Sequence, residues 1–217
     1  MVLMVLDKDL KNKQEFYENE VNKLIEAIQT PENIRGQLYI HKWVLKHTKK
    51  DDYVLDVGCG HGILCYLLKK EGRYPTGVDM TKASIDFCND KIIGVKFTQS
   101  PAEQLPFQDS LFDIVASNQL IEHLPEPKLA IKEMIRVCKP NGKLLITTPI
   151  LDYMGGREVG HLHSFDYYKI MDLFKEFGDD FKVYWLSKFI QYNNQHQPNP
   201  KNIFGVIFNV RKNSRSN

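Results

Sequence analysis

The feature that most constrains this chain is a run in which an apolar segment meets an acid and then three alternating glycines, Val54-Leu55-Asp56-Val57-Gly58-Cys59-Gly60-His61-Gly62. A helix-like stretch over 63–70 follows directly. This order predicts a buried strand, a glycine loop and a helix whose N-terminal N–H groups face the loop. The chain therefore offers bare backbone and free hydrogen-bond donors to a ligand at the end of a strand.

The spacing of the glycines narrows the kind of ligand. A dinucleotide-binding loop has the pattern G-x-G-x-x-G, which leaves room for a pyrophosphate, whereas Gly62 arrives one residue early. Asp56 stands just before the loop, where its charge opposes a diphosphate but suits an ammonium or sulfonium group. Both features disfavour a nicotinamide-dependent oxidoreductase.

The glycine run resembles the nucleotide loop of class I S-adenosylmethionine (SAM) dependent methyltransferases. A second segment, 74–79, has the character of a strand that ends in an acid, and Asp79 lies 21 residues after Gly58. A carboxylate about 20 residues beyond the loop is where α/β nucleotide folds bind a ribose diol. We therefore expect Asp79 to bind the SAM ribose and Met80 to lie against the adenine. The alternative for Asp79 is that it caps the helix that follows.

A third segment strengthens the resemblance. Residues 100–107, Ser-Pro-Ala-Glu-Gln-Leu-Pro-Phe, and the following 112–118 are similar to the D-A-E-x-L-P-F…F-D-x-V region of small methyltransferases that act on quinones, sugars and lipids. In that family an Asp before the Ala binds the adenine amino group. Pro101 replaces it here, which leaves the Ser100 carbonyl and the Ala102 N–H for this contact. With the turn at 138–143, four motifs occur in the family's order over residues 53–149.

Apolar segments of strand and helix character alternate along the chain, which predicts a parallel sheet covered on both faces. The family resemblance implies a Rossmann-like, seven-stranded, mainly parallel α/β sheet with an N-terminal helical cap at 1–50 and a SAM-binding domain at 51–217. Within the cap, 10–29 and 31–47 have helical character. The expected strands are 53–57, 74–78, 95–98, 113–117, 143–148, 181–186 and 203–210, and the expected helices are 63–71, 82–90, 127–138 and 165–177.

Length and charge restrict the class of protein further. The chain has 217 residues, 42% of them hydrophobic, which is enough for one full core. Its formal net charge of +2 does not indicate binding to nucleic acid or to an anionic membrane. We expect no membrane span, no signal peptide, a cytoplasmic location, and four cysteines that stay free and buried. The sequence does not indicate an oligomeric state.

Three histidines are the candidates for catalysis. Methyl transfer to a hydroxyl needs an aligned nucleophile and a base that removes its proton, and histidine titrates near neutral pH. His123 follows the strand at 113–117, while His161 and His163 lie in the segment after the strand at 143–148. If that segment is extended, these two point to opposite sides, so at most one of them faces the site. A structural role for each of the three is the alternative.

A divalent cation is an open alternative near His123. Some relatives, including quinone O-methyltransferases and small-RNA end methyltransferases, carry E-x-x-E-H here and bind a metal with it. This chain has Gln119-x-x-Glu122-His123, so one acid is missing. Glu122, His123 and one of the later histidines still make three ligands, but the lost carboxylate weakens binding of a hard cation. Our leading expectation therefore assigns no metal.

The resemblance implies that the chain transfers a methyl group from SAM, leaving S-adenosylhomocysteine, to a small-molecule or lipid-like acceptor, with O-methylation favoured. Two alternatives remain: a methyltransferase-fold subunit without turnover, and an enzyme with a macromolecular acceptor. The residues expected to bind the cofactor are Asp56, Gly58, Cys59, Gly60, Gly62, Asp79, Met80, Pro101, Ala102 and Asn118.

Overall fold

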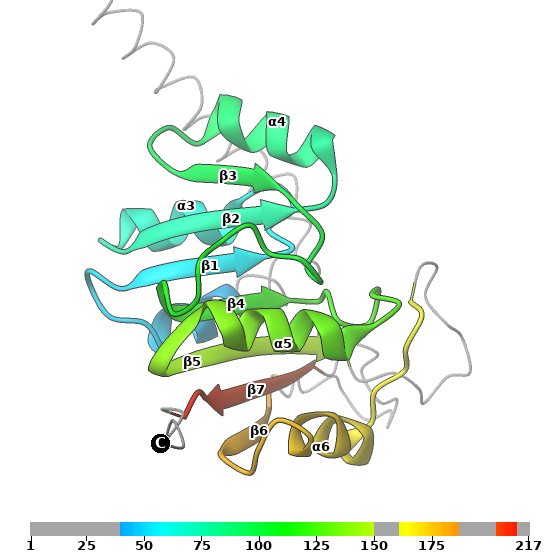
Figure 1. Cartoon of the computed structure of the whole chain (residues 1–217). Coiled ribbons are helices and arrows are strands. Elements are labelled where there is room, and N and C mark those ends of the chain that lie inside the picture. Colours follow the sequence, from blue (N-terminus) through cyan, green and yellow to red (C-terminus); the bar gives the residue numbers. More distant parts are fainter. Residues whose placement is uncertain (1–39, 150–160, 187–202, 212–217) are drawn as a thin grey trace, which may run out of the picture.

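A computed structural model describes residues 40–149, 161–186 and 203–211 of the chain (Figure 1). These residues form one seven-stranded sheet with the strand order β3-β2-β1-β4-β5-β7-β6. The strands are β1 (Tyr53–Val57), β2 (Tyr74–Asp79), β3 (Lys96–Gln99), β4 (Phe112–Asn118), β5 (Cys138–Pro149), β6 (Phe181–Trp185) and β7 (Ile203–Asn209). Strands β1 to β5 pair in parallel, and β7 pairs antiparallel with both β5 and β6. The predicted mainly parallel, seven-stranded sheet is confirmed.

Helices cover both faces of this sheet. They are α3 (Ile63–Lys70), α4 (Lys82–Lys91), α5 (Pro127–Val137) and α6 (Tyr167–Lys175), and residues 40–46 are also helical. Successive strand residues point to opposite faces: Leu55 belongs to the core cluster with α5 and α6, whereas Val54 belongs to the cluster with α3 and the helix at 40–46. A third cluster joins α3 to α4 beside β3.

Helix α5 illustrates why the sequence folds in this way. Pro127 lies at its first turn, where proline is tolerated because that N–H has no partner within the helix. Ala130, Ile131 and Met134 then recur at helical spacing and are completely buried against the sheet. Burial of a side chain as large as Ile131 or Met134 stabilises the fold by roughly 1.5–3 kcal/mol.

The structure differs from the sequence prediction at the start of β5. The predicted strand begins at residue 143, but β5 begins at Cys138, which pairs with Phe112 before the register shifts. Asn141, predicted to lie in a turn, has a positive φ of 67° inside the strand. Its N–H donates to the Val210 carbonyl at 2.8 Å. Pairing with neighbouring strands therefore incorporates turn-forming residues into the strand.

Part of the predicted helical cap lies outside the described residues, including the helix at 10–29. The segment that is described, 40–46, packs Ile40, Trp43 and Val44 into the core. All four cysteines are buried and free, as predicted.

Within the three described ranges, no helix has the length and apolar character needed to cross a membrane.

Candidate functional site

The glycine loop connects β1 to α3 and is fixed by hydrogen bonds to the neighbouring strand. The N–H groups of Gly58 and Cys59 both donate to the Val78 carbonyl, at 2.8 and 2.9 Å. Gly60 has a φ of 51°, and a Cβ added to it would meet no atom within 4 Å. Gly62 has a φ of 75° and begins α3, but a Cβ there would lie 2.6 Å from Ile92. Gly60 therefore faces open space, while Gly62 lets α3 approach its neighbour closely.

The open space beside Gly60 is a cavity of about 330 Å³. The floor is formed by Asp56 and the glycine loop, and the end of β4 contributes Asn118 and Gln119. The helix at 40–46 closes the cavity with His41. The cavity thus lies beyond the carboxyl ends of β1 and β4, where ligands bind in open α/β sheets.

Asp56 is the acidic residue of this cavity, and it is 2% exposed. Burial raises the pKa of its carboxyl group to about 7, and the nearby charge of Asp79 acts in the same direction. The Cys65 thiol lies 3.7 Å from Asp56 Oδ2 and opposes this shift by donating to the carboxylate. A cation in the cavity would favour the ionised form of Asp56.

Asp79 lies at the end of β2 and contacts the same loop. Its Oδ2 accepts the Gly60 N–H at 3.0 Å, and its Oδ1 accepts the Thr81 N–H at 2.8 Å. The N-cap residue of α4 is Thr81, so Asp79 supports the start of that helix without being its cap. Met80, next in the chain, is 70% exposed.

The remaining predicted cofactor residues lie at the same edge of the sheet. Pro101 is exposed and Ala102 is buried, in a turn where Ser100 Oγ donates to the Gln104 carbonyl at 2.6 Å. Asn118 Oδ1 accepts a hydrogen bond from the Thr147 hydroxyl at 3.0 Å. This bond fixes the Asn118 amide at the mouth of the cavity.

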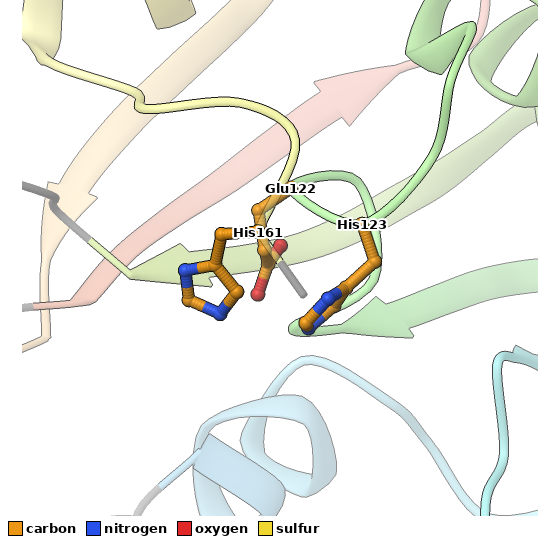
Figure 2. A group of neighbouring side chains, drawn as sticks. All are labelled: Glu122, His123 and His161. Carbon is orange, nitrogen blue, oxygen red and sulfur yellow. The ribbon is translucent and has the colours of Figure 1, made fainter. Parts of the chain in front are cut away.

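Three side chains come together just past the end of β4: Glu122, His123 and His161 (Figure 2). One ligand atom from each lies within 4.8 Å of the others, and the two imidazole rings have centroids 4.6 Å apart. Glu122 is fully buried, and its Oε2 accepts the Thr148 hydroxyl at 3.0 Å. His123 is exposed. The group therefore has a fixed, buried side and an accessible side.

Backbone hydrogen bonds explain why a residue 38 positions further along the chain reaches His123. The Glu122 carbonyl accepts the N–H groups of Leu162 and His163, at 2.8 and 3.0 Å. His163 itself lies apart from the cluster, because its Nε2 contacts the Leu124 carbonyl at 2.9 Å and its ring stacks on Phe165. The structure thus brings His123 and His161 together and directs His163 elsewhere.

Several residues that line the cavity were not predicted to bind the cofactor, among them Gln119 and His41. Gln119 was noted only as a departure from a metal motif, yet it has a φ of 50°, which is uncommon for a residue other than glycine. Such strained backbone clusters at functional sites. His41 gave no signal at all, because a histidine in an amphipathic helix has no motif around it.

The cluster also has the composition of a metal site. Two imidazoles and one carboxylate, with the exposed His123 on one side, match the ligand set of Zn²⁺ or Fe²⁺ sites that have three protein ligands and an open position. The same set lacks the additional carboxylates that Mg²⁺ or Ca²⁺ prefer. The residues present therefore suit a borderline divalent cation.

Comparison with known proteins finds similarity to methyltransferases over the middle of the chain. Residues 55–146 match the model of the methyltransferase domain family. A ubiquinone biosynthesis O-methyltransferase of Coxiella burnetii is 37% identical over 105 residues, which cover 46% of this chain and 45% of that protein. An uncharacterised methyltransferase of Schizosaccharomyces pombe is 34% identical over 146 residues, covering 59% of this chain and 50% of that protein. The chain thus spans about half the length of the curated relatives it matches.

Solved structures agree on the fold. A SAM-dependent methyltransferase from Aquifex aeolicus superposes with a TM-score of 0.62 at 20% identity, covering 87% of this chain and 97% of the other. The YcgJ protein of Bacillus subtilis gives a TM-score of 0.65 at 18% identity, with 80% and 99% coverage. At these identities the likeness concerns the fold alone.

Proposed function

We propose that this chain, which belongs to the class I SAM-dependent methyltransferases through its domain at 55–146, transfers the methyl group of SAM to a hydroxyl group of a small molecule. The observation that carries the proposal is the cavity of about 330 Å³ between the glycine loop and the end of β4. The histidine cluster begins at Glu122, three residues after Gln119 of the cavity lining. SAM occupies the cavity, and the acceptor approaches from the cluster.

The cofactor contacts follow from the charges at the loop. Asp79 binds the ribose, because its carboxylate has acceptor capacity left for two hydroxyl groups beside the Gly60 and Thr81 N–H groups. Asp56 attracts the positive charge of the ammonium and sulfonium groups. Gly60 lets the ligand lie directly on the backbone, because it has no side chain in the open space. The contacts of Met80, Pro101, Ala102 and Asn118 with the adenosine part belong to the same proposal.

The histidines act on the acceptor. The acceptor oxygen attacks the methyl carbon as the carbon–sulfur bond breaks, so the positive charge leaves the sulfur and the hydroxyl proton must leave the oxygen. An imidazole at His123 or His161 takes that proton. Glu122 holds the pair in place and favours the imidazolium that forms, because its carboxylate lies within 4.8 Å of both rings. Of the three predicted histidines, this assigns His163 the structural role.

Hydroxyl methylation has specific support. The Coxiella burnetii relative is named as an O-methyltransferase of ubiquinone biosynthesis. A phenolic hydroxyl also matches the chemistry of the cluster, because its pKa of about 10 is within reach of an imidazole base. We therefore propose an aromatic hydroxyl as the acceptor group.

The test uses SAM labelled on its methyl group, with 3,4-dihydroxybenzoate as a soluble phenolic probe and with a deproteinised extract of the host. We expect label in an organic-soluble product with the wild-type protein, and far less with Asp79→Ala or His161→Ala. Label that moves only into acid-precipitable material would overturn the small-molecule proposal in favour of a macromolecular acceptor. Binding of SAM without any transfer would indicate a subunit that does not turn over.

A divalent cation is a second element that the cluster supports. Glu122, His123 and His161 would hold the ion, and its charge would lower the pKa of a bound acceptor hydroxyl. Metal analysis of the purified protein, repeated with His123→Ala and with His163→Ala as the matched control, tests this directly. Metal lost with the first variant and retained with the second is expected. Equal metal content in both variants would contradict it.

A further inference from the structure

His41 occupies a position that the methyl-transfer chemistry does not use. It lies in the helix at 40–46 and lines the same cavity as Asp56 and the glycine loop. Its Nδ1 atom is buried and makes no hydrogen bond among the described residues. A buried polar atom without a partner is unfavourable, because it has given up its hydrogen bonds to water. A ligand in the cavity is therefore well placed to supply the missing partner.

The position of His41 relative to Asp79 indicates which part of the ligand it meets. Asp79 accepts the Gly60 N–H but is not among the residues that line the cavity, whereas His41 is. If the ribose is at Asp79, the cavity receives the other end of SAM. That end carries an ammonium group and a carboxylate.

Among the described residues that line the cavity, the ammonium group has a partner of opposite charge and the carboxylate has none. Asp56 provides a negative partner for the ammonium group. No Lys or Arg lines the cavity among the described residues, so the carboxylate has no cationic partner there. Burial lowers the pKa of His41 to about 4, so the free protein holds a neutral imidazole at pH 7. A neutral imidazole still carries one N–H, and its tautomer is set by the partner that binds it.

We propose that His41 Nδ1 donates a hydrogen bond to the carboxylate of the amino-acid end of SAM, opposite the ammonium group held at Asp56. The assignment rests on the proposed function, because it takes SAM as the occupant of the cavity. His41 is a binding residue here and takes no part in the transfer. It makes the cavity select ligands that retain the amino acid over those that carry the adenosine part alone.

Two ligands distinguish binding of the carboxylate by His41 from a structural role of His41. S-adenosylhomocysteine contains the amino-acid end, and 5′-methylthioadenosine lacks it while retaining the ribose and adenine. Isothermal titration of both ligands against wild type, His41→Ala and His41→Asn is the experiment. The Asn side chain can present its amide nitrogen near the position of Nδ1, so it serves as the conservative variant.

We expect His41→Ala to bind S-adenosylhomocysteine about tenfold more weakly or worse, as for a lost hydrogen bond to a charged group. Its affinity for 5′-methylthioadenosine should stay within about twofold of wild type, which also shows that the variant is folded. His41→Asn should recover part of the loss. His47→Ala is the matched control, because His47 Nδ1 contacts the Trp43 carbonyl at 2.7 Å and His47 does not line the cavity.

Three outcomes would overturn the assignment. Unchanged affinity of His41→Ala for S-adenosylhomocysteine would remove the contact. An equal loss for both ligands would assign His41 a structural role instead. Wild-type protein that binds neither ligand would refute the proposed function as well, and this result is distinguishable from the other two because it does not involve the variants.

Discussion

Asp79 and Gly60 are joined across the first two strands by a hydrogen bond of 3.0 Å from the glycine N–H to the carboxylate. The acid proposed to bind the cofactor therefore also fixes the loop on which the cofactor would lie. The contact links the carboxyl end of β2 to the turn after β1, so the two parts of the site are held in one geometry before any ligand arrives.

Replacement of Asp79 should separate these two roles. Asp79→Ala is expected to lower the affinity for S-adenosylhomocysteine by about tenfold to a hundredfold, because bonds to two ribose hydroxyls and the loop contact are lost together. Asp79→Asn keeps an acceptor oxygen for the loop and should lose less. Isothermal titration measures both variants, and affinities equal to wild type would refute the ribose assignment.

Asp56 should make the stability of the ligand-free protein depend on pH. Its folded pKa of about 7 lies above its ordinary value of 3.8, so the folded state retains a proton that the unfolded chain releases. Stability is thus greatest below pH 4 for this group and is lost as pH rises through 7, by about 2–4 kcal/mol. Asp56→Asn carries no charge, so its melting temperature should exceed that of wild type at pH 8.

The same comparison at pH 4 should show almost no difference between the two proteins, because the Asp56 carboxyl is then neutral in the folded state. Melting curves from pH 4 to 8 provide the measurement. Asp56→Asn should also bind SAM more weakly, since the partner of the ammonium group has lost its charge. Curves that stay parallel over the whole range would contradict the raised pKa.

Two glycines of one loop should respond differently to alanine. Gly62→Ala places a Cβ 2.6 Å from Ile92 at a positive φ, and we expect a loss of about 2–4 kcal/mol in the free energy of unfolding. At Gly60 the added Cβ points into open space, so only the backbone strain of about 1 kcal/mol should appear. Urea titration compares the two variants.

Gly60→Ala should lose more ligand affinity than Gly62→Ala, although it loses less stability. Gly60→Ala should bind S-adenosylhomocysteine at least about tenfold more weakly, because its methyl group occupies the space that the ligand needs. Titration of Gly60→Ala below its melting temperature checks this. Normal affinity would show that the cofactor does not lie on Gly60.

His161 and His163 should differ in their effect on turnover although they are two residues apart. His161→Ala is expected to reduce kcat by about a hundredfold or more, as for loss of a general base. His163→Ala removes a contact to Leu124 and a stack on Phe165, so it should reduce stability by about 1 kcal/mol and change kcat little. Steady-state kinetics with the phenolic probe gives both values, and equal kcat losses would refute the distinction.

The sequence predicted the sheet because local and global signals agreed in its parallel part. Alternating apolar segments marked the five parallel strands, and the family resemblance implied the last two. The glycine loop and Asp79 marked the ends of β1 and β2. The predicted start of β5 was wrong because Cys138 pairs with Phe112, a tertiary contact. The residues that follow Cys138 are typical of a turn and do not indicate this pairing. Local propensity is weak where a neighbouring strand supplies hydrogen bonds.

Prediction of the site was limited by the same physics. The glycine loop is encoded in consecutive residues, so its conformation could be inferred directly. The pairing of His123 with His161 depends on backbone bonds from residues 162 and 163 to Glu122, and no spacing rule contains them. His41 reaches the cavity only because Trp43 and Val44 anchor its helix in the core. The roles of the predicted site residues remain predictions.

The direction of β7 has a practical consequence for handling the molecule. β7 runs antiparallel to β5 (Figure 1). Ile203 therefore pairs with Pro149 at the carboxyl ends of the parallel strands, where the glycine loop lies, and Asn209 pairs with Lys143 toward their amino ends. Arg211 follows two residues after Asn209, toward those amino ends. A dye or surface linker attached at the exposed position 211 would therefore lie at the opposite end of the strands from the glycine loop and the cavity.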